Sequence, residues 1–145
     1  VRRLAHWRAV AISACEQCGR NRPPQLQAPQ ELEVACNAAD PRSLRLLLDP
    51  DAALSLPAAL TAAAPARSDG AAPGAAASGT VASGTAAALS VTLLVGPEGG
   101  FAAAELQAAL QCGFCPCRLG PRILRAETAP VAALAAIQAV AGDFL

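Results

Sequence analysis

The chain has 145 residues, of which 54% are hydrophobic and 15% charged, and its formal net charge is zero. This length suffices for one domain with its own core, and no uninterrupted apolar run reaches the roughly 18 residues that a membrane-spanning helix needs. Because the chain starts at Val1 and contains no methionine, we expect a fragment that lacks its N-terminal part.

The first fifty residues predict two helices and a strand. Apolar residues recur at helical spacing from residue 4 to residue 18, which predicts an amphipathic helix with a buried apolar seam, ended by residues 21–24 with their two prolines. Residues 32–39 predict a weakly defined helix or turn. The apolar run Leu44–Leu48 ends at Asp49-Pro50 and predicts a buried strand.

A low-complexity tract follows. Residues 57–88 are mostly Ala, Gly, Ser, Pro and Thr, so they carry too little apolar surface to offset the entropy of ordering them. We therefore predict a flexible surface insertion over about residues 57–88. A helix is expected at its start, within residues 54–64, and transient helix where alanine dominates.

The second half predicts two strands and two helices. Val91–Val95 is expected as a strand, 96–100 as a turn, 102–111 as a helix and 115–119 as a short strand. A last helix is marked by apolar residues from 131 to 141, with Pro130 in its first turn. This alternation of helices and strands predicts an α/β domain with a mainly parallel sheet, and apolar strands without polar alternation predict a sheet covered on both faces.

Arginines and cysteines suggest several kinds of site. Every basic residue is arginine, and two clusters, at residues 2–22 and 118–125, suit either contact with phosphates or ordinary solvated helix faces. The C-x-x-C pairs Cys15/Cys18 and Cys112/Cys115, with the single histidine His6, leave open a zinc site or a disulfide. We favour cysteines that act as small buried apolar residues in a reducing cytoplasm.

Three stretches carry candidate chemistry, and each has a simpler alternative. The turn "GPEGG" at residues 96–100 suits close approach of a ligand to the backbone, or is a plain connection. "LGPRILRAETAP" at residues 119–130 is a second candidate ligand loop, or a connector in which Thr128 caps the last helix. In "ACEQCGRNRPP" at residues 14–24, Glu16 and Arg20 are either reactive groups or a surface ion pair.

Taken in order, "EQCGRNRPP", "GPEGGF..AEL", "LGPRILRAETA" and the final "GD" at Gly142-Asp143 resemble the small-subunit ribosomal RNA methyltransferase E family. The resemblance covers residues 2 to about 50 and 89–145. It implies a SPOUT-type α/β fold tied in a deep trefoil knot, N-terminally truncated here, without the family's PUA-like RNA-binding domain. It also implies methylation of N3 of one uridine in 16S ribosomal RNA of the small subunit, by a cytoplasmic homodimer without a metal.

The same resemblance implies the site. S-adenosylmethionine would be held by two knot loops, with the residues Leu94, Val95, Gly96, Glu98, Gly99, Gly100, Leu119, Gly120, Ile123, Leu124, Arg125, Glu127, Thr128 and Ala129. Arg20, Glu16 and Arg125 are the candidate catalytic residues. A carboxylate would take the N3 proton, and Glu16, Glu98 and Glu127 are the candidates. The alternative for Glu98 and Glu127 is that each braces its own loop by accepting backbone hydrogen bonds.

Two departures from the family and two alternative functions remain. Ala102 stands where the family usually has Ser or Thr, which removes a helix cap worth about 1 kcal/mol. Pro23 replaces a branched apolar residue, with a local effect expected. The alternative functions are a zinc-stabilised or RNA-binding module and an inactive fragment.

Overall fold

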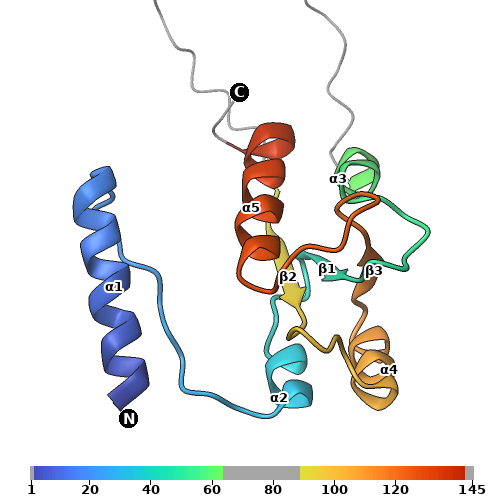
Figure 1. Ribbon diagram of the computed structural model, residues 1–145, viewed down its shortest axis with the longest axis horizontal. Coiled ribbons are helices and arrows are strands. Elements are labelled where there is room, and N and C mark those ends of the chain that lie inside the picture. The colour runs from blue at the N-terminus through green and yellow to red at the C-terminus, as the bar shows by residue number, and fades with distance from the viewer. Residues whose placement is uncertain (1, 64–88, 143–145) are drawn as a thin grey trace, which may run out of the picture.

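A computed structural model describes residues 2–63 and 89–142, in which helices alternate with strands (Figure 1). The elements are α1 (Arg2–Cys18), α2 (Leu32–Asn37), β1 (Leu44–Leu48), α3 (Leu56–Ala63), β2 (Val91–Val95), α4 (Ala103–Gln111), β3 (Cys115–Cys117) and α5 (Thr128–Ala141). The two five-residue strands have the bounds that their apolar runs predict. The predicted third strand is shorter, because it ends at Cys117 instead of residue 119.

The three strands form one parallel sheet in the order β2-β1-β3. In the middle strand, Leu48 pairs with Val95 on one side and with Cys117 on the other, so the carboxyl ends of all three strands meet at one edge. This confirms the predicted α/β class and its parallel sheet.

Helices cover both faces of the sheet (Figure 1). Leu46 and Leu47 are both fully buried, and because successive strand residues point to opposite faces they enter two separate cores. Leu46 packs with residues of α3 and α5, and Leu47 packs with residues of α2 and α4. A strand covered on both sides need not alternate apolar with polar residues, and β1 consists of four leucines and Arg45 without such alternation.

Helix α3 lies at the start of the predicted insertion. It runs through Ala63, and Leu60 is fully buried beside α5. The first seven residues of the tract are therefore helical and reach the core through Ala59 and Leu60, as expected for a helix at its start, and the rest, residues 64–88, lies outside the described residues. Pro57 is tolerated because it falls in the first helical turn, where its missing N–H has no partner to lose.

Helix α1 contradicts one prediction. It is helical as expected, but its apolar seam is not buried: Trp7 is 47% exposed and Val10 55%, and Cys15 alone within the helix is buried. The reason is that α1 lies apart from the sheet and contacts the extended segment that follows it, where Arg8 donates to the Leu26 carbonyl at 3.3 Å (Figure 1). Apolar spacing predicts which side of a helix seeks cover, and leaves open what covers it.

The end of α1 comes earlier than the prolines predict. Gly19 has a φ of +74°, and the Arg20 amide donates to the Cys15 carbonyl at 2.9 Å. This is a left-handed glycine cap, which stops the helix before the proline pair. None of the helices in the described ranges combines the length and apolar character needed to cross a bilayer.

Candidate functional site

Two adjoining hollows lie where the strands end. The narrow hollow, about 510 Å³ with its open mouth, is lined by Leu48, Asp49, Pro50, Val95, Gly96, Leu119, Gly120, Arg122, Leu124, Ala126 and Ala129. The wide hollow, about 900 Å³ with its mouth, is lined by Leu47, Leu48, Asp49, Pro50, Asp51, Gly96, Glu98, Gly99, Gly100, Phe101, Leu106 and Ile123. The carboxyl edge of a parallel sheet is where such folds bind ligands.

The structure brings most of the predicted cofactor residues to these hollows, although they come from two distant loops. The narrow hollow contains Val95, Gly96, Leu119, Gly120, Leu124 and Ala129, and the wide hollow contains Gly96, Glu98, Gly99, Gly100 and Ile123. Leu94, Arg125, Glu127 and Thr128 line neither. Leu94 instead packs into the core on the α2–α4 side of the sheet.

The glycine-rich turn is shaped for close approach. The Gly100 amide donates to the Pro97 carbonyl at 2.9 Å, and Gly100 has a φ of +72°, a conformation that favours glycine. At Gly96 a Cβ would lie 3.0 Å from the Phe101 ring. The ring therefore packs directly on the bare backbone at the boundary of the two hollows.

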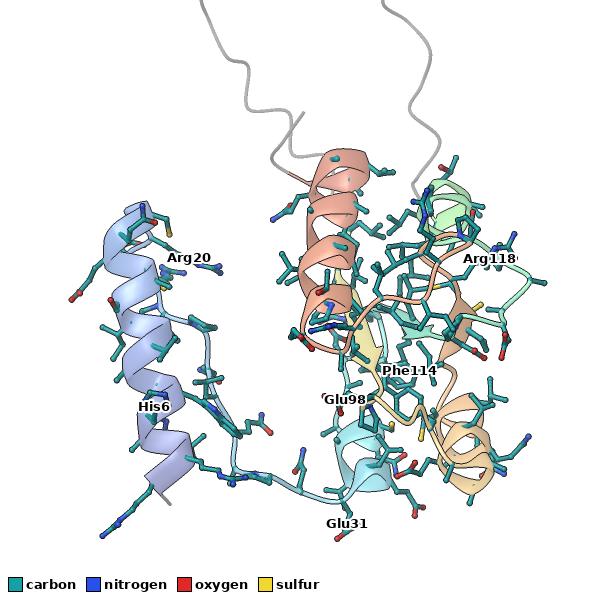
Figure 2. All side chains as sticks on the ribbon, in the orientation of Figure 1. His6, Arg20, Glu31, Glu98, Phe114 and Arg118 are labelled. Atoms are coloured by element: carbon teal, nitrogen blue, oxygen red, sulfur yellow. The ribbon has the colours of Figure 1, made fainter. Side chains whose placement is uncertain are left out.

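Glu98 does not brace its own loop. Figure 2 shows it below the end of β2, and it lines the wide hollow. Among residues 2–63 and 89–142, no hydrogen bond or ion pair is made by its carboxylate. The carboxylate is therefore available to a ligand, which favours the first of the two interpretations of this residue.

The charges of the wide hollow are all of one sign. Asp49, Asp51 and Glu98 line it, and no basic residue does. Asp49 is held in place, because its amide donates to the Cys117 carbonyl and its Oδ1 accepts from the Asp51 amide, both at 3.0 Å. Such a site favours a cation.

Asp49 and its neighbours Leu48 and Pro50 are site residues that the sequence prediction missed. The signal was present, since Asp49-Pro50 directly follows a buried strand, the same placement that singled out Gly96. Arg122 and Ala126 were also missed, although both lie inside the loop that was predicted.

The loop at residues 119–130 does not end in the helix cap that one interpretation assigns to Thr128. Thr128 is the first residue of α5 and not its cap; Glu127 occupies the cap position and makes no side-chain capping bond. Glu127 instead lies 4.0 Å from Arg125 in an ion pair between side chains that are 66% and 86% exposed. Neither residue faces the hollows.

The other candidate catalytic residues lie elsewhere. Glu16 is on α1 and Arg20 directly follows it, and Figure 2 shows Arg20 far from Glu98. Both side chains are exposed, and the predicted ion pair between them is not formed. Within a single chain, the structure does not bring either residue to the hollows.

The arginine clusters have mixed roles. The guanidinium of Arg118 donates to the carbonyls of Ala52 and Ala53 at 2.7 and 2.6 Å, so it fixes the segment after β1 (Figure 2). Arg122 and Arg125, like the five arginines of residues 2–22, are exposed. These exposed groups are the ones available to phosphates.

The two C-x-x-C pairs lie on different elements. Cys15 and Cys18 are on α1, whereas Cys112 follows α4 and Cys115 begins β3. All six cysteines are free thiols. Within the described part of the chain, no group of three or more His, Cys, Asp or Glu side chains is placed to hold a metal ion.

The sequence of this chain matches one protein family and is similar to named members of it. A family model described as RNA methyltransferase domain matches residues 1–138. Two proteins of Buchnera aphidicola strains, both named ribosomal RNA small subunit methyltransferase E, are similar: one is 33% identical over 95% of this chain and 46% of its own length, and the other 30% identical over 98% and 46%.

Solved structures of methyltransferases are similar to this chain in both fold and sequence. A ribosomal RNA small subunit methyltransferase E from Neisseria gonorrhoeae, bound to S-adenosylmethionine, matches 99% of this chain and 50% of its own with a TM-score of 0.73 and 33% identity. A putative methyltransferase from Legionella pneumophila, also with that cofactor, matches 95% and 46% with a TM-score of 0.68 and 33% identity. The chain spans about half the length of these relatives.

Proposed function

This chain belongs to the RNA methyltransferase domain family, and from that premise we propose that it is the cofactor-binding part of an enzyme that methylates ribosomal RNA of the small subunit. The proposed acceptor is N3 of one uridine in 16S ribosomal RNA, and the proposed methyl donor is S-adenosylmethionine. The observation that carries the proposal is the pair of hollows at the strand ends, built from the two loops that resemble the family's cofactor loops. We further propose the trefoil knot of that family and a cytoplasmic location.

The residues present fit this cofactor. Leu48, Val95, Leu119 and Leu124 give the narrow hollow an apolar lining suited to an adenine ring. The carboxylates of Asp49, Asp51 and Glu98 suit the positive charge of the sulfonium and amino groups. When bound, the cofactor supplies a methyl carbon attached to a positively charged sulfur, open to attack by a nucleophile.

The chain's own side chains would handle the proton and the charge. Uridine N3 is protonated at neutral pH, so a carboxylate must accept its proton, and a cation stabilises the negative charge that spreads to the neighbouring carbonyl oxygens. Glu98 is the candidate base that already lines a hollow, with Glu16 and Glu127 as the others. Arg20 and Arg125 are the candidate cations.

A homodimer would unite these groups. Arg20 and Glu16 lie apart from their own hollows, while α1 exposes Trp7 and α5 exposes Val131, apolar residues that a second copy would cover. We therefore propose that α1 of one copy supplies Glu16 and Arg20 to the hollow of the other.

Cofactor binding can be tested by calorimetric titration. Asp49→Asn and Glu98→Gln should each weaken S-adenosylmethionine binding about two- to fivefold, the usual size for a partly solvated charge pair, and should affect the product S-adenosylhomocysteine less, because it lacks the sulfonium charge. Glu33→Gln, at an exposed acid of α2 outside both hollows, is the matched control. Absence of binding by the unaltered chain would refute its role as cofactor-binding part, and stoichiometric zinc with no cofactor effect would favour a zinc-stabilised module.

Sharing of the site between two copies needs a mixing experiment. In a methylation assay on small ribosomal subunits, with the full-length protein, Arg20→Ala and Arg125→Ala should each lower activity by about tenfold or more, the usual contribution of a positioned charge in the transition state. Mixed dimers of the two variants should regain part of the activity, because one of their two sites is intact. Arg3→Ala, at an exposed arginine of the same helix, should stay active. Mixtures as inactive as their parents would contradict shared sites.

A further inference from the structure

Cys36 and Cys112 lie at the contact of α2 with α4, and neither lines a hollow. Cys36 is 1% exposed and lies in the core with Leu47 and Phe114, and Cys112 is half-buried against the same core. The Cys112 thiol is 3.5 Å from Oδ1 of Asn37, the residue next to Cys36. Both side chains therefore pack in the same apolar cluster, where α2 meets α4.

We propose that Cys36 and Cys112 form a redox pair that closes to a disulfide when a small-molecule disulfide such as oxidised glutathione is in excess. The contact of α2 with α4 holds both thiols in one cluster in the reduced fold, so the bond would join two elements that are already neighbours. This inference does not depend on the proposed methyl transfer.

The surroundings assign a role to each thiol. Burial, and then the neighbouring Cys112 thiol, raise the pKa of Cys36, so it is the poorer nucleophile toward an outside reagent. Cys112 is the accessible partner. The guanidinium of Arg45 donates to the carbonyls of Cys112 and Ala39, and its charge lowers the pKa of Cys36, which favours the thiolate needed for the second step.

The exchange then has two steps that balance. The Cys112 thiolate attacks one sulfur of oxidised glutathione, forms a mixed disulfide and releases one glutathione thiolate, which takes up a proton. The Cys36 thiol loses its proton, its sulfur attacks the Cys112 sulfur, and the second glutathione leaves. The two protein thiols are oxidised by two electrons in total, and one oxidised glutathione is reduced to two molecules of glutathione.

Peptide mapping by mass spectrometry tests the pair. After incubation with oxidised glutathione, cleavage at arginine should join residues 21–42, which contain Cys36 alone, to residues 68–118, and further cleavage after Phe114 should place the bond at Cys112. Cys112→Ser should abolish the cross-link, Cys36→Ser should leave glutathione attached to Cys112, and Cys115→Ser, at an exposed thiol of β3, should cross-link as the unaltered chain does. A cross-link through Cys115, or glutathione on Cys112 of the unaltered chain with no cross-link, would overturn the proposal.

The unfolding temperatures of the oxidised and reduced protein show whether the disulfide fits the native fold or strains it. The disulfide would close a loop from residue 36 to residue 112 in the unfolded chain, so the oxidised protein should unfold at a higher temperature than the reduced one. The Cys115→Ser variant should show the same upward shift on oxidation, and Cys112→Ser should show none. A lower unfolding temperature after oxidation would show that the bond distorts the fold and would contradict a pair that the native fold accommodates.

Discussion

Cys117 has its pKa moved furthest from the ordinary value among the described residues. Its thiol is fully buried at the end of β3, and burial followed by the neighbouring Cys115 raises its pKa from 9.0 to about 11. The unfolded chain therefore loses this proton near pH 9, while the folded chain keeps it until about pH 11. The stabilisation is complete below pH 9 and is lost as the pH rises from 9 to 11.

Urea unfolding at pH 8 and pH 10 measures this loss. Cys117→Ala should start less stable, because it leaves a small cavity, but its stability should fall less between the two pH values than that of the unaltered chain. Cys18→Ala is the control, since Cys18 is an exposed thiol on α1, outside the sheet. An equal fall in the Cys117→Ala variant would show that this thiol does not cause the alkaline loss.

Helix α4 shows what one missing hydroxyl costs an element. Glu105 accepts a hydrogen bond from the Ala102 amide at 2.8 Å, but Ala102 has no side-chain oxygen to return a bond to the first helical turn. Half of a capping box is therefore in place. Ala102→Ser should complete it and raise the free energy of unfolding by about 1 kcal/mol.

The control for that substitution is Ala104→Ser, which puts the same hydroxyl inside the helix at an exposed position. It should be neutral or slightly destabilising, because serine competes with the helix for backbone hydrogen bonds. Equal effects of both substitutions, measured by thermal unfolding, would show that the cap position has no special value.

Among the elements, the bounds of the strands were more predictable than the surfaces on which the helices pack. β1 and β2 are apolar runs that stop at Asp49-Pro50 and at Gly96-Pro97, so composition and breakers alone define them. The exposed seam of α1 was not predictable, because apolar spacing indicates one side of a helix but does not encode what packs on it. Similarly, Thr128 has the right chemistry for a cap, but the chain enters α5 one residue earlier.

For the whole molecule, α3 connects the low-complexity tract to the core. Leu60 is fully buried between the sheet and α5, in the cluster that includes Leu56 and Ala133. Leu60→Ala should lower the free energy of unfolding by about 2–5 kcal/mol, through lost burial and a cavity. Leu54→Ala, at a side chain 37% exposed, should cost much less in the same urea titration. Similar losses would place α3 outside the cooperative core.

The candidate site was predictable only in part, because some of its residues are brought together only by the order of the strands in the whole fold. Gly96 and Gly120 could be singled out because a strand end and a glycine turn are local signals. Asp49 enters the same hollows only because β1 is the middle strand, and strand order is not written in any single stretch of the chain. The separation of Arg20 from the hollows likewise follows from where α1 lies.

The central place of β1 has a consequence during synthesis. The ribosome makes β1 first, yet both of its neighbours come later, one at Val91–Val95 and the other at Cys115–Cys117. Until residue 117 has emerged, at least one edge of β1 keeps unpaired amides and carbonyls, and Leu46 and Leu47 lack their full cover. A nascent chain at that stage would present an open hydrophobic strand to chaperones or to other chains, and completing β3 is the step that removes it.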